Sequence, residues 1–256
     1  MVLFYAGNTF GLLTSTDLVN WQERSRIDIP NSWECPDLMR MQVKETGEWL
    51  WVLMGVHNTY YVGRLSGGVF TPITELQKQD YGELLYASHT FANAPGGRFV
   101  QIGCQGGSVF PMLAFDQMMA FPKELSLHTS AKGYSLHAEP VEEIVNLYGS
   151  NVQTFTDKQI SAEEKVTSSG VAFHVKASIN LAETTASKFG FVIDGVNITY
   201  MPTNGYIGVT GSNMRHAVNA NNIVPKDGIL DLEIILDTGM VEVFANDGEF
   251  SSTVFC

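Results

Sequence analysis

The chain has 256 residues, of which 45% are hydrophobic, and a formal net charge of −12 at pH 7. This length allows one large or two ordinary domains, and the hydrophobic share is sufficient for a buried core. The excess of acidic residues would repel phosphate groups, which argues against nucleic acid or an anionic membrane as a partner and favours a neutral one.

The first half of the chain, to about Leu127, consists of short apolar runs separated by Gly, Asn and Pro. Examples are 50–54, 60–62 and 99–102. This alternation is typical of a β meander. Residues 1–6 are apolar but lack a basic region before them, so they predict a strand and no signal peptide. The sequence also contains no apolar run long enough to cross a membrane.

A short helix is predicted between the two halves, in a linker over residues 138–150. Pro140 stands at a position typical of a helix start, and Glu142 and Glu143 follow in the first turn. The Gly-Ser-Asn run at 149–151 ends the helix. We therefore expect one domain over 1–137 and a second over 151–256.

The second half predicts long strands with one buried face. Apolar and other residues alternate with a period of two over 171–181, and again over 230–236. The Asp-Thr-Gly run at 237–239 predicts a turn that pairs 240–245 back as a hairpin. Together these signals indicate an all-β sandwich.

The pentapeptide Trp33-Glu34-Cys35-Pro36-Asp37 is the strongest candidate for chemistry. An indole beside a carboxyl group excludes water and disfavours the ionised form, which is typical of a general acid. The proline stiffens the turn that carries it. Cys35 has no neighbouring cysteine or histidine in the sequence that would activate a thiolate, so we expect a small buried side chain there.

The remaining sequence predicts neither a cofactor nor a metal site. Three scattered cysteines form no disulfide or metal framework. The six histidines lack His-x-His or His-Glu-x-x-His spacing, and no phosphate-binding glycine loop occurs.

Seven motifs occur in an order that covers nearly the whole chain: Ser15–Trp21, Trp33–Asp37, Tyr60–Gly63, Asp80–Gly82, Tyr86–Phe91, Phe121–Leu127 and Val241–Gly248. In this order the chain resembles glycoside hydrolase family 32, which contains invertases, levanases and inulinases. The resemblance implies a partial five-bladed β-propeller followed by a β-sandwich. Blades of about 40 to 50 residues leave room for about three.

The resemblance also implies a glycosidase of the β-fructofuranosidase type, which hydrolyses β-fructosidic bonds of sucrose or fructans with retention. Glu34 would be the acid/base, and Trp33, Asp37 and Tyr86 would contact the sugar. Trp33 could instead only shield Glu34, and Tyr86 could be a core residue. The family's nucleophile and stabiliser aspartates lie in Asn-Asp-Pro-Asn and Arg-Asp-Pro segments, and neither string occurs here. We therefore expect that the family's N-terminal part is missing.

Two hypotheses remain open at this point. The chain is the C-terminal portion of a fructosidase, or it is an inactive truncated relative that acts as a carbohydrate-binding or protein-interaction module. Asp37, Asp80 and Glu83 are the other carboxylates near the motifs, and none is favoured as a replacement nucleophile. The glycine-rich run 102–107 replaces a tryptophan-rich strand that is common in the family, which weakens any conclusion about substrate specificity.

An incomplete propeller leaves an unpaired sheet edge, and such an edge favours self-association. The location of the protein in the cell is not indicated by the sequence. An extracellular location is plausible if an N-terminal part is missing.

Overall fold

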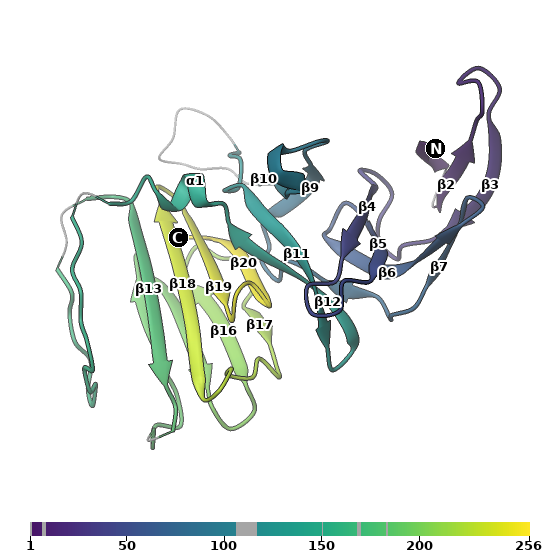
Figure 1. Cartoon of the computed structure of the whole chain (residues 1–256). Coiled ribbons are helices and arrows are strands. Elements are labelled where there is room, and N and C mark those ends of the chain that lie inside the picture. The colour runs from purple at the N-terminus through teal and green to yellow at the C-terminus, as the bar shows by residue number, and fades with distance from the viewer. Residues whose placement is uncertain (1, 7–8, 106–116, 150, 168–169, 183) are drawn as a thin grey trace.

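The computed structural model describes residues 2–6, 9–105, 117–149, 151–167, 170–182 and 184–256. Figure 1 shows three small sheets that follow one another in an open arc, and a two-sheet sandwich beside the last of them. All five sheets are antiparallel, so the predicted all-β fold is confirmed.

The arc begins with the sheet β1 (Val2–Ala6), β2 (Thr9–Thr14) and β3 (Gln22–Ile27). The second sheet contains β4 (Asp37–Gln42), β5 (Trp49–Met54), β6 (Thr59–Ser66) and β7 (Val69–Pro72), and β8 (Gln77–Lys78) pairs with β6. The third contains β9 (Leu85–Thr90), β10 (Phe99–Gln105), β11 (Lys123–Ser130) and β12 (Gly133–Pro140), with a 3-10 turn at Pro95–Gly97.

Each pair of neighbouring sheets in the arc shares a small apolar core. Phe10 and Leu12 of the first sheet pack with Leu53 and Phe70 of the second. The second and third sheets meet through a larger cluster, whose fully buried members are Val43, Leu50, Val52, Val62, Leu127 and Ala138. The face-to-face packing of successive sheets follows from the alternation of buried and exposed residues along each strand.

The sandwich consists of two four-stranded sheets. One contains β13 (Phe173–Asn180), β18 (Ile229–Asp237), β19 (Met240–Ala245) and β20 (Phe250–Phe255), and the other β14 (Phe189–Ile193), β15 (Val196–Met201), β16 (Tyr206–Gly211) and β17 (Val218–Ala220). One apolar cluster fills the space between them. The predicted hairpin is confirmed, because Asp237 pairs with Met240 across the turn. Val171 lies before β13 and is exposed, whereas Phe173, Val175, Ile179 and Leu181 pack on this core.

The linker differs from the prediction at Pro140. Pro140 pairs with Lys123 as the last residue of β12, and the helix α1 is a single turn over Glu142–Val145. Ala138 N donates to Gly248 O at 3.0 Å, so the end of β12 is already held against the sandwich. Pro140 is therefore a strand end and not a helix start, and the placement of the domain boundary stays a prediction.

A buried ionic cluster joins the third sheet to the sandwich. Lys123 Nζ of β11 donates to Asp80 Oδ2 at 2.6 Å and to Thr253 Oγ1 of β20 at 2.9 Å, and it lies 3.5 Å from Glu242 Oε2 of β19. Asp80 Oδ1 accepts from Gly82 N and Thr253 N. The side chains of Lys123, Asp80 and Glu242 are no more than 1% exposed.

The two carboxyl groups of this cluster respond differently to burial. Burial raises the pKa of Asp80, but the charge of Lys123 and the hydrogen bonds that Asp80 accepts outweigh this effect. The pKa of Asp80 therefore lies below its ordinary value. Burial raises the pKa of Glu242 from 4.5 to about 7, because Lys123 only partly compensates and Asp80 adds repulsion. Lys123 thus forms an ion pair with Asp80, and Glu242 holds a proton more tightly than an ordinary carboxyl group.

This shift predicts how Glu242 affects stability as the pH changes. Between pH 4.5 and about 7 the unfolded chain releases the Glu242 proton before the folded chain does, so rising pH destabilises the fold across this window. We expect Glu242→Gln, which stays neutral, to gain on the order of 3 kcal/mol over the wild type at pH 8 relative to pH 4.5. Urea unfolding at the two pH values measures the difference.

Lys123→Met removes the cation of the cluster, whereas Glu242→Gln removes a carboxyl group. Lys123→Met should lose about 3–5 kcal/mol at pH 8, because it leaves the Asp80 carboxylate buried without its cation. A Glu242→Gln stability difference that is the same at pH 4.5 and pH 8 would contradict this account of the cluster.

Candidate active site around Glu34

Glu34 lies in the loop that joins β3 to β4, and a buried serine holds this loop on the second sheet. Val56 N donates to Ser32 Oγ at 2.7 Å, and Ser32 N donates to Ile29 O at 3.0 Å. Ser32 is 4% exposed. Opposite Ser32 stands Gly55, where a Cβ atom would lie 1.9 Å from Ser32 Oγ. The loop therefore approaches the second sheet closely only because residue 55 has no side chain.

The Glu34 carboxyl is paired with a tyrosine from the third sheet. Tyr86 Oη of β9 donates a hydrogen bond to Glu34 Oε1. This bond, together with burial and the Glu34 charge, raises the pKa of Tyr86 to about 12, and a hydrogen bond from Trp33 opposes the shift. Tyr86 therefore remains a hydrogen-bond donor to Glu34 at neutral pH. The Glu34 residue is exposed, so its carboxyl group is accessible from solvent.

His57 completes a group of three rings beside Glu34, and the sequence did not reveal it. Its ring lies edge-on to Trp33 at 5.2 Å and to Tyr86 at 5.3 Å. Burial and the charge of Lys78 lower the pKa of His57, while Glu34 opposes this. The indole of Trp33 packs on His57 and is 44% exposed, and its two expected roles, shielding of Glu34 or contact with a sugar, stay predictions.

A chain of buried polar groups fixes β9 and thereby Tyr86. Asn58 Nδ2 donates to Leu85 O at 2.8 Å, and Ser88 Oγ donates to Asn58 Oδ1. Gln101 Nε2 of β10 donates to Ser88 Oγ at 2.8 Å. Of these, Asn58, Ser88 and Gln101 are all about 1% exposed. Buried polar side chains that are linked in this way hold one backbone arrangement, because any shift would leave a donor or acceptor without a partner.

Asp37 joins the strand after the Glu34 loop to the strand that carries Tyr86. Its Oδ2 accepts from Thr90 N and from Thr90 Oγ1, each at 2.8 Å, and His89 Nδ1 lies 3.9 Å away. Asp37 and Thr90 thus connect β4 with β9. The predicted contact between Asp37 and a sugar stays a prediction, and Thr90 is a partner that the sequence alone did not identify.

Two free cysteines lie beside these residues. Cys104 Sγ of β10 donates to Tyr86 O at 3.4 Å, and Cys35 follows Glu34 with φ of 51°. Burial, with the charges of Glu34 and Cys104, raises the pKa of Cys35. A half-buried thiol with a raised pKa stays protonated at neutral pH, which fits the small side chain expected there better than a nucleophile.

Two other carboxylates near the motifs are engaged elsewhere. Asp80 is enclosed in the ionic cluster, and Glu83 accepts from the backbone N–H groups of Arg215 and His216 in the sandwich.

In the glycine-rich run, a Cβ atom at Gly103 would lie 2.7 Å from Leu85 and 2.9 Å from Ser88, so this glycine permits the close contact with β9. Gly106 and Gly107 lie outside the described residues.

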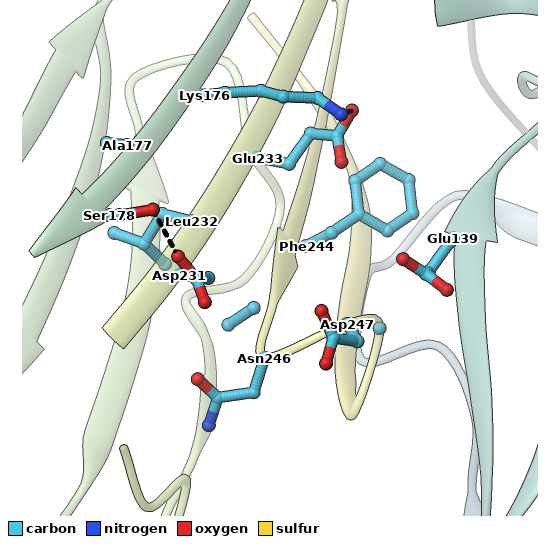
Figure 2. Close-up of a pocket in the computed structure, with 12 residues that line it drawn as sticks. Glu139, Lys176, Ala177, Ser178, Asp231, Leu232, Glu233, Phe244, Asn246 and Asp247 are labelled. Carbon is cyan, nitrogen blue, oxygen red and sulfur yellow. Dashed lines mark hydrogen bonds and ion pairs between the residues drawn. The ribbon is translucent and has the colours of Figure 1, made fainter. Parts of the chain in front are cut away.

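A separate acidic groove lies where β12 approaches the sandwich. Figure 2 shows Glu139 facing Phe244 and Asp247, with Glu233 and Lys176 across the groove. None of its lining residues belongs to the group around Glu34.

Over the described part of the chain, no group of three His, Cys, Asp or Glu side chains is placed to hold a metal ion. Among the same residues, no helix is long and apolar enough to span a membrane.

Comparison with protein families identifies two adjacent matches. The model of the glycosyl hydrolases family 32 N-terminal domain matches residues 5–140, and that of the family 32 C-terminal domain matches residues 143–255. A levanase from Bacillus sp. (strain L7) is 28% identical over 97% of the chain, which spans 32% of that relative. An extracellular exo-inulinase from Aspergillus ficuum is 24% identical over 94% of the chain, which spans 53% of it.

Solved structures show the same fold. The exo-inulinase of Aspergillus awamori superposes with a TM-score of 0.78 at 20% identity, covering 97% of this chain and 57% of that one. A fructofuranosidase from Schwanniomyces occidentalis, complexed with fructose, gives a TM-score of 0.71 at 18% identity, covering 99% of this chain and 63% of that one. The expected partial propeller and sandwich are confirmed, and the chain spans between about a third and two thirds of the proteins compared.

Gly55→Ala tests the close approach of the Glu34 loop. The new Cβ would lie 1.9 Å from Ser32 Oγ, so the loop must shift, and overpacking of this kind costs about 1–3 kcal/mol. Urea unfolding measures the loss. Gly149→Ala is the matched control, because no atom lies within 4 Å of the position that its Cβ would take. Equal unfolding midpoints for the two variants would contradict the packing argument.

Asp37→Ala and Thr90→Val test the connection between β4 and β9. Each single change already breaks the hydrogen bond between the two side chains, so the two losses of stability should not add. We expect a coupling energy of about 1–2 kcal/mol in a double-mutant cycle of urea unfolding. Strictly additive losses would show that the two side chains do not stabilise each other.

Proposed function

The chain belongs to glycosyl hydrolase family 32, and on that basis we propose that it carries the acid/base part of a site that hydrolyses β-fructosidic bonds in fructans or sucrose. The observation that carries the proposal is the accessible Glu34 carboxyl, held by the Tyr86 hydroxyl inside the region that matches the family's N-terminal domain. The names of the relatives, levanase and exo-inulinase, support a fructan as the substrate.

Glu34 acts in both halves of a retaining mechanism. As an acid it protonates the glycosidic oxygen while the fructosyl group is transferred to an enzymic carboxylate, and as a base it then removes a proton from the water that releases fructose. Tyr86 donates to one carboxyl oxygen and orients the group, so that the other oxygen can reach the substrate. Trp33, Asp37 and Tyr86 border the sugar, as the family resemblance implies.

The nucleophile is supplied from outside these 256 residues. A retaining site needs a second carboxyl group about 5–5.5 Å from the acid. Asp80 is ion-paired with Lys123, and Glu83 accepts from backbone N–H groups of the sandwich. Oδ2 of Asp37 already accepts from Thr90. The family's Asn-Asp-Pro-Asn and Arg-Asp-Pro segments, absent from this sequence, supply the nucleophile and the stabiliser.

The net charge and the named relatives also bear on the substrate and the location of this reaction. A net charge of −12 is compatible with a neutral polysaccharide substrate. The relatives that are named extracellular enzymes support an extracellular location. Association of two copies through the edge strand β1 stays a prediction from the open arrangement of the first sheet.

Fructose release from levan, inulin and sucrose tests the proposal. We expect no release by the 256-residue chain alone, and release when the chain is extended upstream by the aspartate-bearing segments of a levanase relative. Glu34→Gln in the extended protein should lower kcat by at least about 100-fold, because it removes the general acid. Glu142→Gln, on the exposed first turn of α1, should leave the rate unchanged.

A Glu34→Gln variant as active as the extended wild type would refute the role of Glu34. If the extended protein binds these sugars but releases no fructose, the chain is a carbohydrate-binding module and not part of an enzyme.

A further inference from the structure

His57 is placed to control the pair of Glu34 and Tyr86, although it bonds to neither. Its ring lies between two aromatic side chains from different segments, edge-on to Trp33 at an interplanar angle of 80° and to Tyr86 at 61°. Trp33 precedes Glu34 in the chain, and Tyr86 is the donor to Glu34. The three rings therefore connect both partners of the hydrogen bond through one histidine.

Hydrogen bonds within the turn and to two other segments fix the turn that carries His57. Asn58 N donates to Gly55 O and Gly55 N donates to Thr59 O, each at 3.0 Å, so the turn from β5 to β6 is closed on itself. Val56 N donates to the Glu34 loop through Ser32 Oγ, and Val56 O accepts from Ala87 N of β9 at 3.1 Å. The residue before His57 thus contacts both the segment that carries Glu34 and the strand that carries Tyr86.

The direction of the Tyr86 hydroxyl depends on the orientation of its ring, on which His57 acts together with the hydrogen bond from Trp33. Tyr86 is half-buried, and its hydroxyl reaches across to an exposed carboxyl group. A ring contact with an edge-to-face geometry restricts rotation about the bonds of the tyrosine side chain and therefore fixes the direction of its hydroxyl. The neutral form of His57, which its lowered pKa favours, also does not compete with Tyr86 for the Glu34 charge.

We propose that His57 is a positioning residue, whose ring holds the Tyr86 hydroxyl on the Glu34 carboxyl by packing edge-on between Trp33 and Tyr86. The inference rests on the proposed function only for its catalytic meaning. The ring contact and the hydrogen bond are properties of the 256-residue chain itself and can be measured there.

The test follows the Cζ carbon of Tyr86 by NMR at pH 7 in protein with 13C-labelled tyrosine, since this carbon reports the hydrogen bonding of the hydroxyl. Tyr86→Phe identifies the signal, and Glu34→Gln gives its position when the carboxylate acceptor is gone. We expect His57→Ala, and His57→Leu as a variant that keeps the bulk, to move the signal more than half of the way to the Glu34→Gln position. His57→Phe, which keeps an aromatic edge, should leave it near the wild-type position.

His174→Ala is the matched control. His174 also lies edge-on to a tyrosine, Tyr148, at 5.6 Å and 61°, but in the sandwich. It should leave the Tyr86 signal unchanged, so a general loss of stability cannot mimic the expected result.

Two outcomes overturn the proposal. In one, the Tyr86 signal stays at its wild-type position in both His57→Ala and His57→Leu. In the other, His57→Phe moves it as far as His57→Ala does, which would show that ring packing is not the cause. The proposed function fails by a different result, an active Glu34→Gln enzyme, and that result leaves the NMR comparison valid.

Discussion

The buried ion pair between Lys123 and Asp80 is the interaction on which the rest of the structure depends. A charge with 1% exposure is tolerated only when its partner is present and properly placed. Lys123 begins β11, Asp80 follows β8, and the groups around them, Glu242 and Thr253, belong to the sandwich. These segments must therefore come together in one arrangement, and the third sheet is fixed on the sandwich.

The same junction supports the candidate site. The segment from Asp80 to Leu84 runs along β20, where Tyr81 N donates to Ser251 O at 2.8 Å and Leu84 N donates to Thr253 O at 3.3 Å. A Cβ atom at Gly82 would lie 2.1 Å from Thr253 O, so this approach requires glycine. Two residues after Leu84 the chain reaches Tyr86. The sandwich thus contributes to the geometry at Glu34 without placing a residue there.

Four carboxyl groups of the first half have four different environments. Asp80 is buried and ionised beside Lys123, Asp37 accepts from Thr90, Glu83 accepts from backbone N–H groups of the sandwich, and Glu34 is accessible with a single tyrosine donor. Three of them stabilise contacts between segments. Among these four, only Glu34 combines an accessible carboxyl group with an orienting side-chain donor, an arrangement suited to proton transfer.

The sequence by itself determined the all-β class and several strands, among them 50–54, 230–236 and 240–245, because alternation of apolar residues and turn-forming residues are local signals. The pentapeptide 33–37 indicated the candidate acid. The sequence also determined the family, because seven motifs keep their order. Tertiary structure alone decided that Pro140 ends a strand, since the pairing with Lys123 and the contact of β12 with Gly248 override its local preference. It also revealed His57, Thr90 and the role of Lys123. These residues act through partners that lie from 24 to 130 positions away in the chain, and no local pattern encodes a contact over such separations.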